Sequence, residues 1–143
     1  MEKINAFGIC LYKYHKNSTE VLLCKSVNSN EKWGFLKGVL LKDETVTNTA
    51  LREFKEESNI KIEEKYLENF FLQKNETKDI GIYLVNYLNI TNIDTYFFGN
   101  VLKKENLSSE NTAVKFFDIK NLPLIKKKQS NMILDIVKYL NTK

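Results

Sequence analysis

The sequence is poor in the residues that mark several common kinds of site. It contains one proline, one histidine and two cysteines among 143 residues. The single histidine, His15, excludes a histidine-based triad or zinc site. Cys10 and Cys24 lie in apolar segments without the close spacing of metal-binding cysteines, so we expect buried, reduced thiols. No apolar run approaches the roughly 18 residues of a membrane span, and the N-terminal stretch is too short for a secretory signal. These absences predict a cytoplasmic protein.

Arginine is almost absent as well. Of 22 basic residues 21 are lysines, and the one arginine, Arg52, is followed at once by Glu53. The planar guanidinium suits fixed carboxylate pairing better than a flexible lysine does. Glu44 precedes this arginine and Glu56 and Glu57 follow it, so carboxylate partners are available on both sides. A pairing of Arg52 with Glu44 would fix the loop before the arginine against the segment that carries it.

The segment around this arginine has the composition of a helix. Residues 46–58 include neither glycine nor proline and are rich in residues that favour helix. Thr45 or Thr47 can cap the start with a hydroxyl oxygen. Asn59 is a natural stop, because asparagine tolerates the left-handed conformation in which many helices end.

Three glutamates share one face of this predicted helix. At about 100° per residue, Glu53, Glu56 and Glu57 fall within an arc of roughly 140° or less, whereas Leu51 and Phe54 point toward a core. Like charges on one face repel, and Mg²⁺ or Mn²⁺, which prefers oxygen ligands, would remove that repulsion. The alternative is an acidic helix face exposed to solvent, which is common. The spacing of the neighbouring residues favours the metal site.

Residues 38–60, GVLLKDETVTNTALREFKEESNI, follow a fixed pattern that resembles the Nudix box, G-x5-E-x7-R-E-U-x-E-E-x-G-U, where U is a bulky apolar residue. Asn59 is the one departure, because the family has glycine there. The chain thus resembles a Nudix hydrolase, which implies an α/β fold: an α/β/α sandwich with a mixed β-sheet, as a single domain over residues 1–143. The matching residues are Gly38, Glu44, Arg52, Glu53, Phe54, Glu56, Glu57 and Ile60.

The order of the predicted elements agrees with that sandwich. Apolar runs and alternation predict a β-rich chain around the central helix, with a second, amphipathic helix near the end. The expected strands cover residues 4–14, 20–25, 66–73, 80–88, 94–101 and 114–119, with a short segment at 33–37, and the second helix covers 131–140.

The resemblance also implies roles for the box residues. Glu56, Glu57 and the carbonyl of Gly38 would be metal ligands, and the cofactor would be Mg²⁺ or Mn²⁺. Glu53 would be either a ligand or the general base, because family members differ in this. We predict that Glu57 is essential to catalysis, and that Glu44 supports the site through its arginine.

The segment before the box, WGFLKG at residues 33–38, is similar to W-G-F-P-K-G in Nudix hydrolases of dinucleoside polyphosphates, inositol polyphosphates and messenger-RNA caps. Leu36 replaces the proline of that pattern. Lys37 would lie beside the substrate phosphates, or it is a solvated loop lysine. Trp33 would pack against the box loop, or it stacks on a base.

A second segment, residues 108–123, is similar to the region after the box in diadenosine-tetraphosphate hydrolases and cap hydrolases. In those enzymes a glutamate precedes an aromatic residue by six positions, as Glu110 precedes Phe116 here. The resemblance implies that Glu110 approaches the metal from a loop as an extra ligand or base. The alternative is an exposed loop carboxylate.

The chemistry implied is attack of water on phosphorus in a nucleoside diphosphate derivative, most simply a dinucleoside polyphosphate or a nucleoside triphosphate. A second hypothesis keeps the chemistry and places it at RNA 5′ ends, in line with the net charge of +4. It requires the lysines at 103–104 and 126–128 to share a surface next to the metal site. A third hypothesis is a Nudix-fold module that binds nucleotide or RNA without catalysis. No feature indicates DNA or membrane binding.

Overall fold

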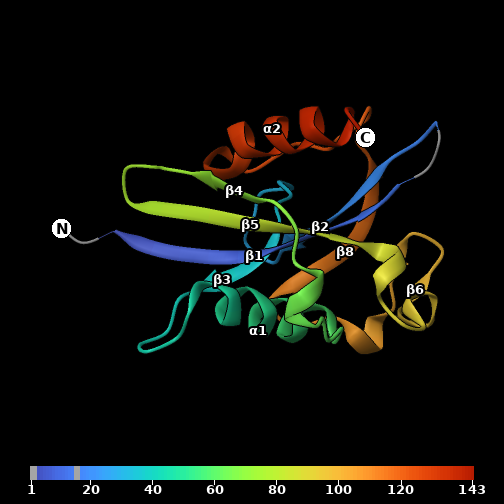
Figure 1. The fold of residues 1–143 in the computed structure, drawn as a ribbon, viewed down its shortest axis with the longest axis horizontal. Coiled ribbons are helices and arrows are strands. Elements are labelled where there is room, and N and C mark those ends of the chain that lie inside the picture. Colours follow the sequence, from blue (N-terminus) through green and yellow to red (C-terminus); the bar gives the residue numbers. More distant parts are fainter. Residues whose placement is uncertain (1–2, 15–16) are drawn as a thin grey trace.

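The computed structural model describes residues 3–14 and 17–143, so His15 lies outside the described residues. A twisted sheet forms the middle layer, with helix α1 (Val46–Ser58) against one face and helix α2 (Ser130–Leu140) against the other (Figure 1). The predicted α/β/α sandwich is confirmed. In the part of the chain that the structure describes, no helix is long and apolar enough to cross a membrane.

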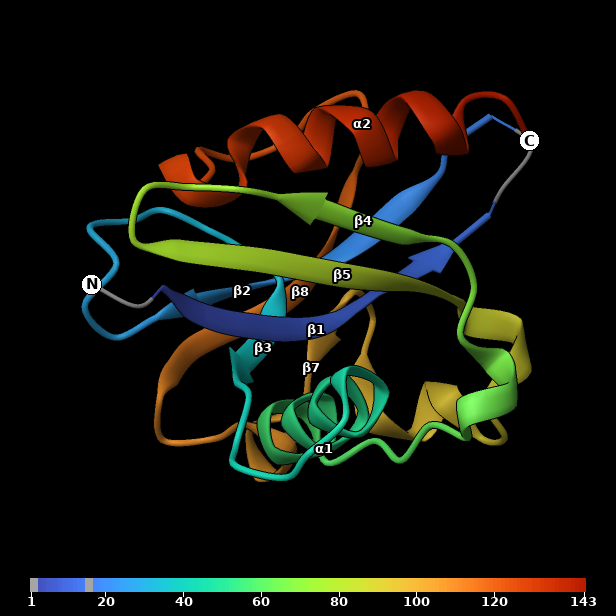
Figure 2. The ribbon, with the colours of Figure 1, turned by 60° about the vertical axis from the view of Figure 1, so that its left-hand side comes forward.

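The sheet is mixed, as predicted. Its strand order is β4-β5-β1-β2-β8-β7-β6, and the short strand β3 pairs with β1 off this path. Strand β1 runs parallel to β5 and antiparallel to β2 and β3 (Figure 2). The bounds are β1 Ile4–Lys13, β2 Glu20–Ser26, β3 Leu36–Val39, β4 Phe70–Gln73, β5 Lys78–Asn86, β6 Phe97–Phe98, β7 Val101–Leu102 and β8 Asn111–Asp118.

Strand β1 is central because both of its faces are apolar. Residues 6–12 are buried without interruption, which is typical of a strand covered on both sides. Alternate side chains enter two separate cores. Phe7, Ile9 and Leu11 join the cluster under α1, which includes Phe54. Ala6, Cys10 and Tyr12 join the cluster under α2, which includes Ile133 and Ile136.

Strand β3 presents two consecutive residues to opposite faces of the sheet. Gly38 pairs with Phe7 and Lys37 pairs with Gly8 in the antiparallel register. Paired residues on neighbouring strands share a face, so Gly38 faces α1 together with Phe7. Lys37 therefore faces the side of the sheet that α2 covers.

Both ends of α1 use the side chains that the sequence predicted. The Thr45 hydroxyl accepts a hydrogen bond of 3.1 Å from the Asn48 amide. At the other end Asn59 takes a left-handed conformation, with φ of 65°, and its amide donates to the Lys55 carbonyl. Asparagine thus ends the helix as glycine would.

The start of helix α2 is bonded to a residue of β4, the strand at one edge of the sheet. The Gln73 side chain on β4 accepts hydrogen bonds from the backbone amides of Asn131 and Met132, at 3.0 and 2.9 Å. These amides have no partner within the helix, because the first turn of a helix leaves its N–H groups free. A β4 residue therefore supplies the cap.

The predicted strand at 94–101 is wrong. Residues Ile93–Tyr96 form a 3₁₀ turn, and the two-residue strands β6 and β7 close a hairpin around Gly99. Gly99 has a φ of 64°, which a continuous strand does not allow. The strand predicted at 66–73 begins only at Phe70, because Glu64–Tyr66 is another 3₁₀ turn.

Candidate functional site

Arg52 lies at the centre of the box and binds three glutamates at once. Its Nε and Nη2 donate to the two oxygens of Glu44 at 2.6 and 3.0 Å. Its Nη1 donates to Glu53 at 2.7 Å and, more weakly, to Glu56 at 3.3 Å. Nη2 also donates to the Val39 carbonyl at 3.1 Å. This set of bonds uses the fork geometry that lysine lacks.

Glu44 joins the box loop to the helix. Besides Arg52, its Oε1 accepts from the Leu41 amide at 3.1 Å and the Thr49 hydroxyl at 2.7 Å. The hydrogen bonds from Arg52 are the largest cause that lowers the pKa of Glu44, to about 2. Glu44 is therefore a permanent anion near neutral pH, and the structure brings it to the arginine as the sequence predicted.

Glu57, predicted to share one carboxylate face with Glu53 and Glu56, is buried, with 5% of its surface exposed. Its Oε1 accepts a hydrogen bond of 3.1 Å from the Asn111 side chain. Its Oε2 is buried without any hydrogen-bond partner. Burial is the main cause that raises the pKa of this carboxyl to about 7. An unpaired buried carboxylate oxygen is costly.

Glu53 lies against the backbone of β3. A methyl group placed on Gly38 would overlap the Glu53 carboxylate, so only glycine lets the carboxylate approach the Gly38 backbone this closely. Burial raises the pKa of Glu53 even though Arg52 lowers it. The carboxylate is thereby placed against the backbone of Gly38, whose carbonyl the resemblance assigned to the metal.

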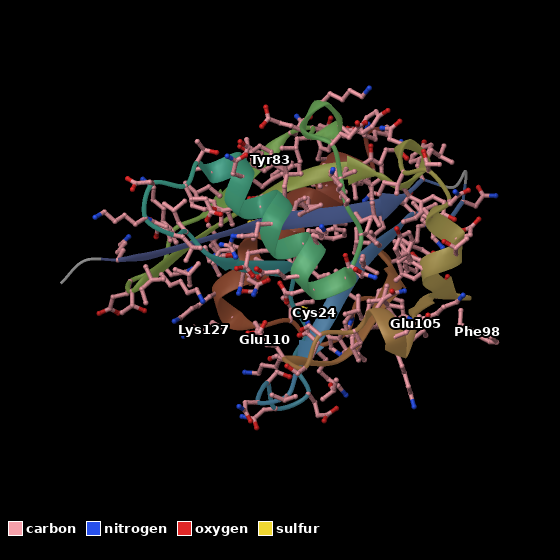
Figure 3. All side chains as sticks on the ribbon, turned by 90° about the horizontal axis from the view of Figure 1, so that it is seen from below. Cys24, Tyr83, Phe98, Glu105, Glu110 and Lys127 are labelled. Atoms are coloured by element: carbon pink, nitrogen blue, oxygen red, sulfur yellow. The ribbon has the colours of Figure 1, made fainter. Side chains whose placement is uncertain are left out.

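Glu110 reaches the box carboxylates from the loop before β8. Its own side chain is exposed, and its charge is among the causes that raise the pKa of both Glu53 and Glu57. Figure 3 shows Glu110 beside α1 near Cys24. The residue that follows it, Asn111, is the one that binds Glu57. The segment at 108–123 therefore brings two polar side chains to the box.

Sequence reasoning missed Asn111. This side chain is 5% exposed and is the hydrogen-bond partner of Glu57. Its position next to Glu110, three residues before the strand predicted at 114–119, was the available signal. An asparagine in a loop is usually solvated, so the sequence gives no reason to expect it in the core.

The box carboxylates suit a divalent cation, although their oxygens do not surround one common position. Among the described residues, no three histidine, cysteine, aspartate or glutamate side chains are arranged around a common metal position. The physical reason is that Arg52 holds Glu53 and Glu56. The free Oε2 of Glu57 is the observation that favours a cation, because a positive partner would offset its burial. Oxygen donors of this kind suit Mg²⁺ and Mn²⁺.

Trp33 and Lys37 lie on the side of the sheet that α2 covers. The Trp33 ring is 9% exposed and packs edge-on against Phe117 of β8, at 4.7 Å between centroids. Its packing partner is therefore β8 rather than the box loop. Lys37 is half-buried on the face opposite Gly38, and burial followed by the charges of Lys78 and Lys126 lowers its pKa to about 8.

Both cysteines are free and buried, as predicted. Burial raises the pKa of the Cys24 thiol to about 12 and raises that of Cys10 further. A thiol with so high a pKa is a poor nucleophile. Neither cysteine therefore takes part in covalent chemistry at this site.

The fold is shared with solved Nudix structures. A Caenorhabditis elegans Ap4A hydrolase is 18% identical, with 98% of this chain and 99% of that chain covered and a TM-score of 0.67. A MutT Nudix hydrolase from Burkholderia pseudomallei is 17% identical, with 95% and 99% covered and a TM-score of 0.66. An ADP-ribose pyrophosphatase from Streptococcus suis is 14% identical, with 95% and 90% covered and a TM-score of 0.58.

No curated protein matches the sequence significantly. The sequence itself matches the NUDIX domain over residues 3–135, a span that includes the box, the arginine network around it, Glu110 and Asn111. The chain therefore belongs to the NUDIX family of hydrolases.

Proposed function

We propose that this protein is a divalent-metal-dependent pyrophosphohydrolase that cleaves a diphosphate linkage by attack of water on phosphorus. The substrate would be a nucleoside diphosphate derivative, with a dinucleoside polyphosphate or a nucleoside triphosphate as the first choice. The observation that carries the proposal is the buried, unpartnered Oε2 of Glu57 beside the box carboxylates. A carboxylate kept in this state is suited to binding a cation rather than to stability.

Mg²⁺ or Mn²⁺ would be held by Glu56, Glu57 and the Gly38 carbonyl, with Glu53 as a further ligand or the base. Such a cation supplies neutralisation of phosphate charge and activation of water at neutral pH. Glu110, exposed and close to the box, is the second candidate for the base. It can reach an attacking water without leaving its loop.

The protein's own residues prepare the site before any substrate binds. The Asn111 amide fixes one oxygen of Glu57 and leaves the other free. Arg52 offsets part of the negative charge of Glu53 and Glu56 while the cation is absent. Glu44, which is held by three different donors, keeps the arginine in place.

The test is a hydrolysis panel with Mg²⁺ or Mn²⁺, run on the wild-type protein and Glu57→Gln. The panel contains diadenosine tetraphosphate, nucleoside triphosphates, ADP-ribose and 5′-triphosphorylated RNA. We expect metal-dependent turnover that falls by on the order of a thousandfold in Glu57→Gln, because several kcal/mol of transition-state stabilisation are lost.

A folded Glu57→Gln protein with wild-type turnover would overturn the assignment of this residue. Turnover confined to triphosphorylated RNA would move the substrate to RNA 5′ ends. Binding of nucleotide or RNA without turnover of any compound would favour a non-catalytic module instead.

A further inference from the structure

A cavity of about 290 Å³ lies between the turns that follow α1 and the turns that follow β5. Its size is close to the lower end of the range for small-molecule pockets, roughly 300–1,000 Å³. Its described lining includes none of the box residues. Figure 2 shows these turns, in green and yellow, at one end of the molecule, away from β3. The lining consists of Lys61, Ile62, Glu63, Tyr66, Asn89, Ile90, Thr91 and Tyr96.

The walls of this cavity are anchored to α1 and to the core beneath it. The Thr47 hydroxyl, at the start of α1, donates a hydrogen bond of 3.3 Å to Glu64. Ile62 is 5% exposed and belongs to the apolar cluster under α1, and the rings of Tyr66 and Tyr96 pack against the same cluster. The cavity is therefore formed before any ligand binds.

Two half-buried tyrosine rings line the cavity from opposite walls. Lys65 covers Tyr66, with its Nζ at 5.2 Å from the ring centroid. Among the described residues, neither Tyr66 nor Tyr96 stacks on another aromatic ring. An aromatic ring that is held in place with a free face is a stacking surface for a planar heterocycle.

The backbone of one wall lacks partners. Residues 60–63 lie outside any helix or strand. Within the part of the chain that the structure describes, the amides and carbonyls of Lys61 and Ile62 pair with no other backbone group. Ile62 is nevertheless buried, and buried backbone groups in folded proteins are nearly always paired. A ligand that carries a donor next to an acceptor would satisfy both groups of this residue.

The charges around the cavity balance. Its lining has one basic residue, Lys61, and one acidic residue, Glu63. The Glu63 carboxylate also lies 3.8 Å from Lys65. A chain of phosphates would meet a carboxylate as well as an ammonium group here, so the lining favours an uncharged ligand. The polar side chains of Asn89 and Thr91 supply further donors and acceptors for such a ligand.

We propose that this cavity is a second binding site, separate from the carboxylate site, which takes an uncharged nucleobase or nucleoside. The base would stack on a tyrosine ring and form hydrogen bonds with the backbone of Ile62. Nucleobases carry donors and acceptors side by side on one edge, which matches the amide and carbonyl of a single extended residue. The base can come from a free nucleoside or from a single-stranded nucleic acid, because both present the same edge.

The test measures binding to the full chain in EDTA, so that no hydrolysis takes place. The probes are adenosine, guanosine, ribose and a short single-stranded oligoadenylate. We expect the nucleosides to bind and ribose, which lacks a base, not to bind. Backbone amide resonances should shift most in residues 61–66 and 89–96. Much tighter binding of oligoadenylate than of adenosine would identify a nucleic-acid strand as the source, and similar affinity would identify the free nucleoside.

The variant is Tyr96→Leu, which removes one ring and keeps an apolar side chain. We expect adenosine to bind roughly five- to a hundredfold more weakly, because a stacking partner is lost. Tyr96→Phe keeps the ring and should bind adenosine like the wild type. The matched control is Tyr14→Leu, which removes a tyrosine that lines a different cavity and should leave adenosine binding unchanged.

Asn89→Ala tests the site without touching the core, because Asn89 is exposed. We expect it to weaken adenosine binding by roughly two- to tenfold, as loss of one hydrogen bond would. Absence of nucleoside binding, equal losses in Tyr96→Leu and Tyr14→Leu, or largest shifts at the box residues would each overturn the proposal. Binding is measured without metal or turnover, so it succeeds or fails independently of the hydrolysis panel.

Discussion

At the scale of single residues, Glu57 and Glu44 are the same type of side chain with pKa values shifted in opposite directions. Glu44 accepts bonds from Arg52 and has a lowered pKa, whereas Glu57 is buried with one oxygen unpaired and has a raised pKa. Spacing in the sequence predicted that both belong to one site. It could not predict this division, because burial depends on how the start of β8 packs against α1.

The buried carboxyl of Glu57 makes the stability of the metal-free protein depend on pH. Its pKa rises from an ordinary 4.5 to about 7, so the folded state binds this proton more tightly than the unfolded chain. The stabilisation is complete below about pH 4.5 and is lost as the pH rises through about 7. We expect the free energy of unfolding to fall by roughly 2–3 kcal/mol across this window.

Urea unfolding in EDTA over that pH range measures this effect. Glu57→Gln should reduce the slope of the curve, because an amide does not titrate, and leave the contribution of groups such as Glu53, whose pKa burial also raises. The same slope in both proteins would assign the pH dependence to another group. Glu44 has a lowered pKa, so it changes the free energy of unfolding only below its ordinary pKa of 4.5 and does not contribute in this window.

At the scale of elements, the box helix was predicted to the residue and the region around residues 94–101 was not. Helix 46–58 has local signals at both ends, a hydroxyl cap and a left-handed asparagine. The segment at 94–101 has the aromatic content of a strand. Its backbone instead turns at Gly99, and this turn is set by pairing of β7 with β8. Tertiary contacts of this kind leave little trace in composition.

Substitutions at Asn59, which stands where the family pattern has glycine, measure how much the cap at the end of α1 contributes to stability. Asn59 holds a φ of 65°, which glycine adopts freely and alanine does not. We expect Asn59→Gly to leave the protein as stable or slightly more stable, and Asn59→Ala to destabilise it by about 1 kcal/mol. Equilibrium unfolding in urea tests both. Equal stability of the two variants would show that the cap conformation does not matter here.

At the scale of the whole molecule, the fold does not depend on the metal site. Two apolar clusters fill the two sides of the sheet, and the box carboxylates lie at the edge of one of them. The sequence predicted this architecture from the resemblance of the box to the Nudix pattern and from the order of the predicted elements. It predicted the lysines at 126–128 only as a separate segment, since Lys37 and Lys78 come next to them when β3, β5 and the start of α2 meet.

Removal of metal should therefore leave the fold intact. We expect EDTA to leave the far-ultraviolet circular dichroism unchanged, while saturating Mg²⁺ raises the midpoint of thermal unfolding by roughly 5–10 °C. The rise should be larger above pH 7 than near pH 5, because the cation competes with the proton on Glu57. An equal rise at both pH values, or in Glu57→Gln, would place the cation elsewhere.

The capping of α2 by Gln73 has a consequence for the order of folding. The first amides of this helix find their acceptor on β4, more than 50 residues earlier in the chain. Closing so long a loop is slow in comparison with forming a helix. The cap of the C-terminal helix therefore forms only once this long loop has closed and Gln73 lies next to residues 131 and 132.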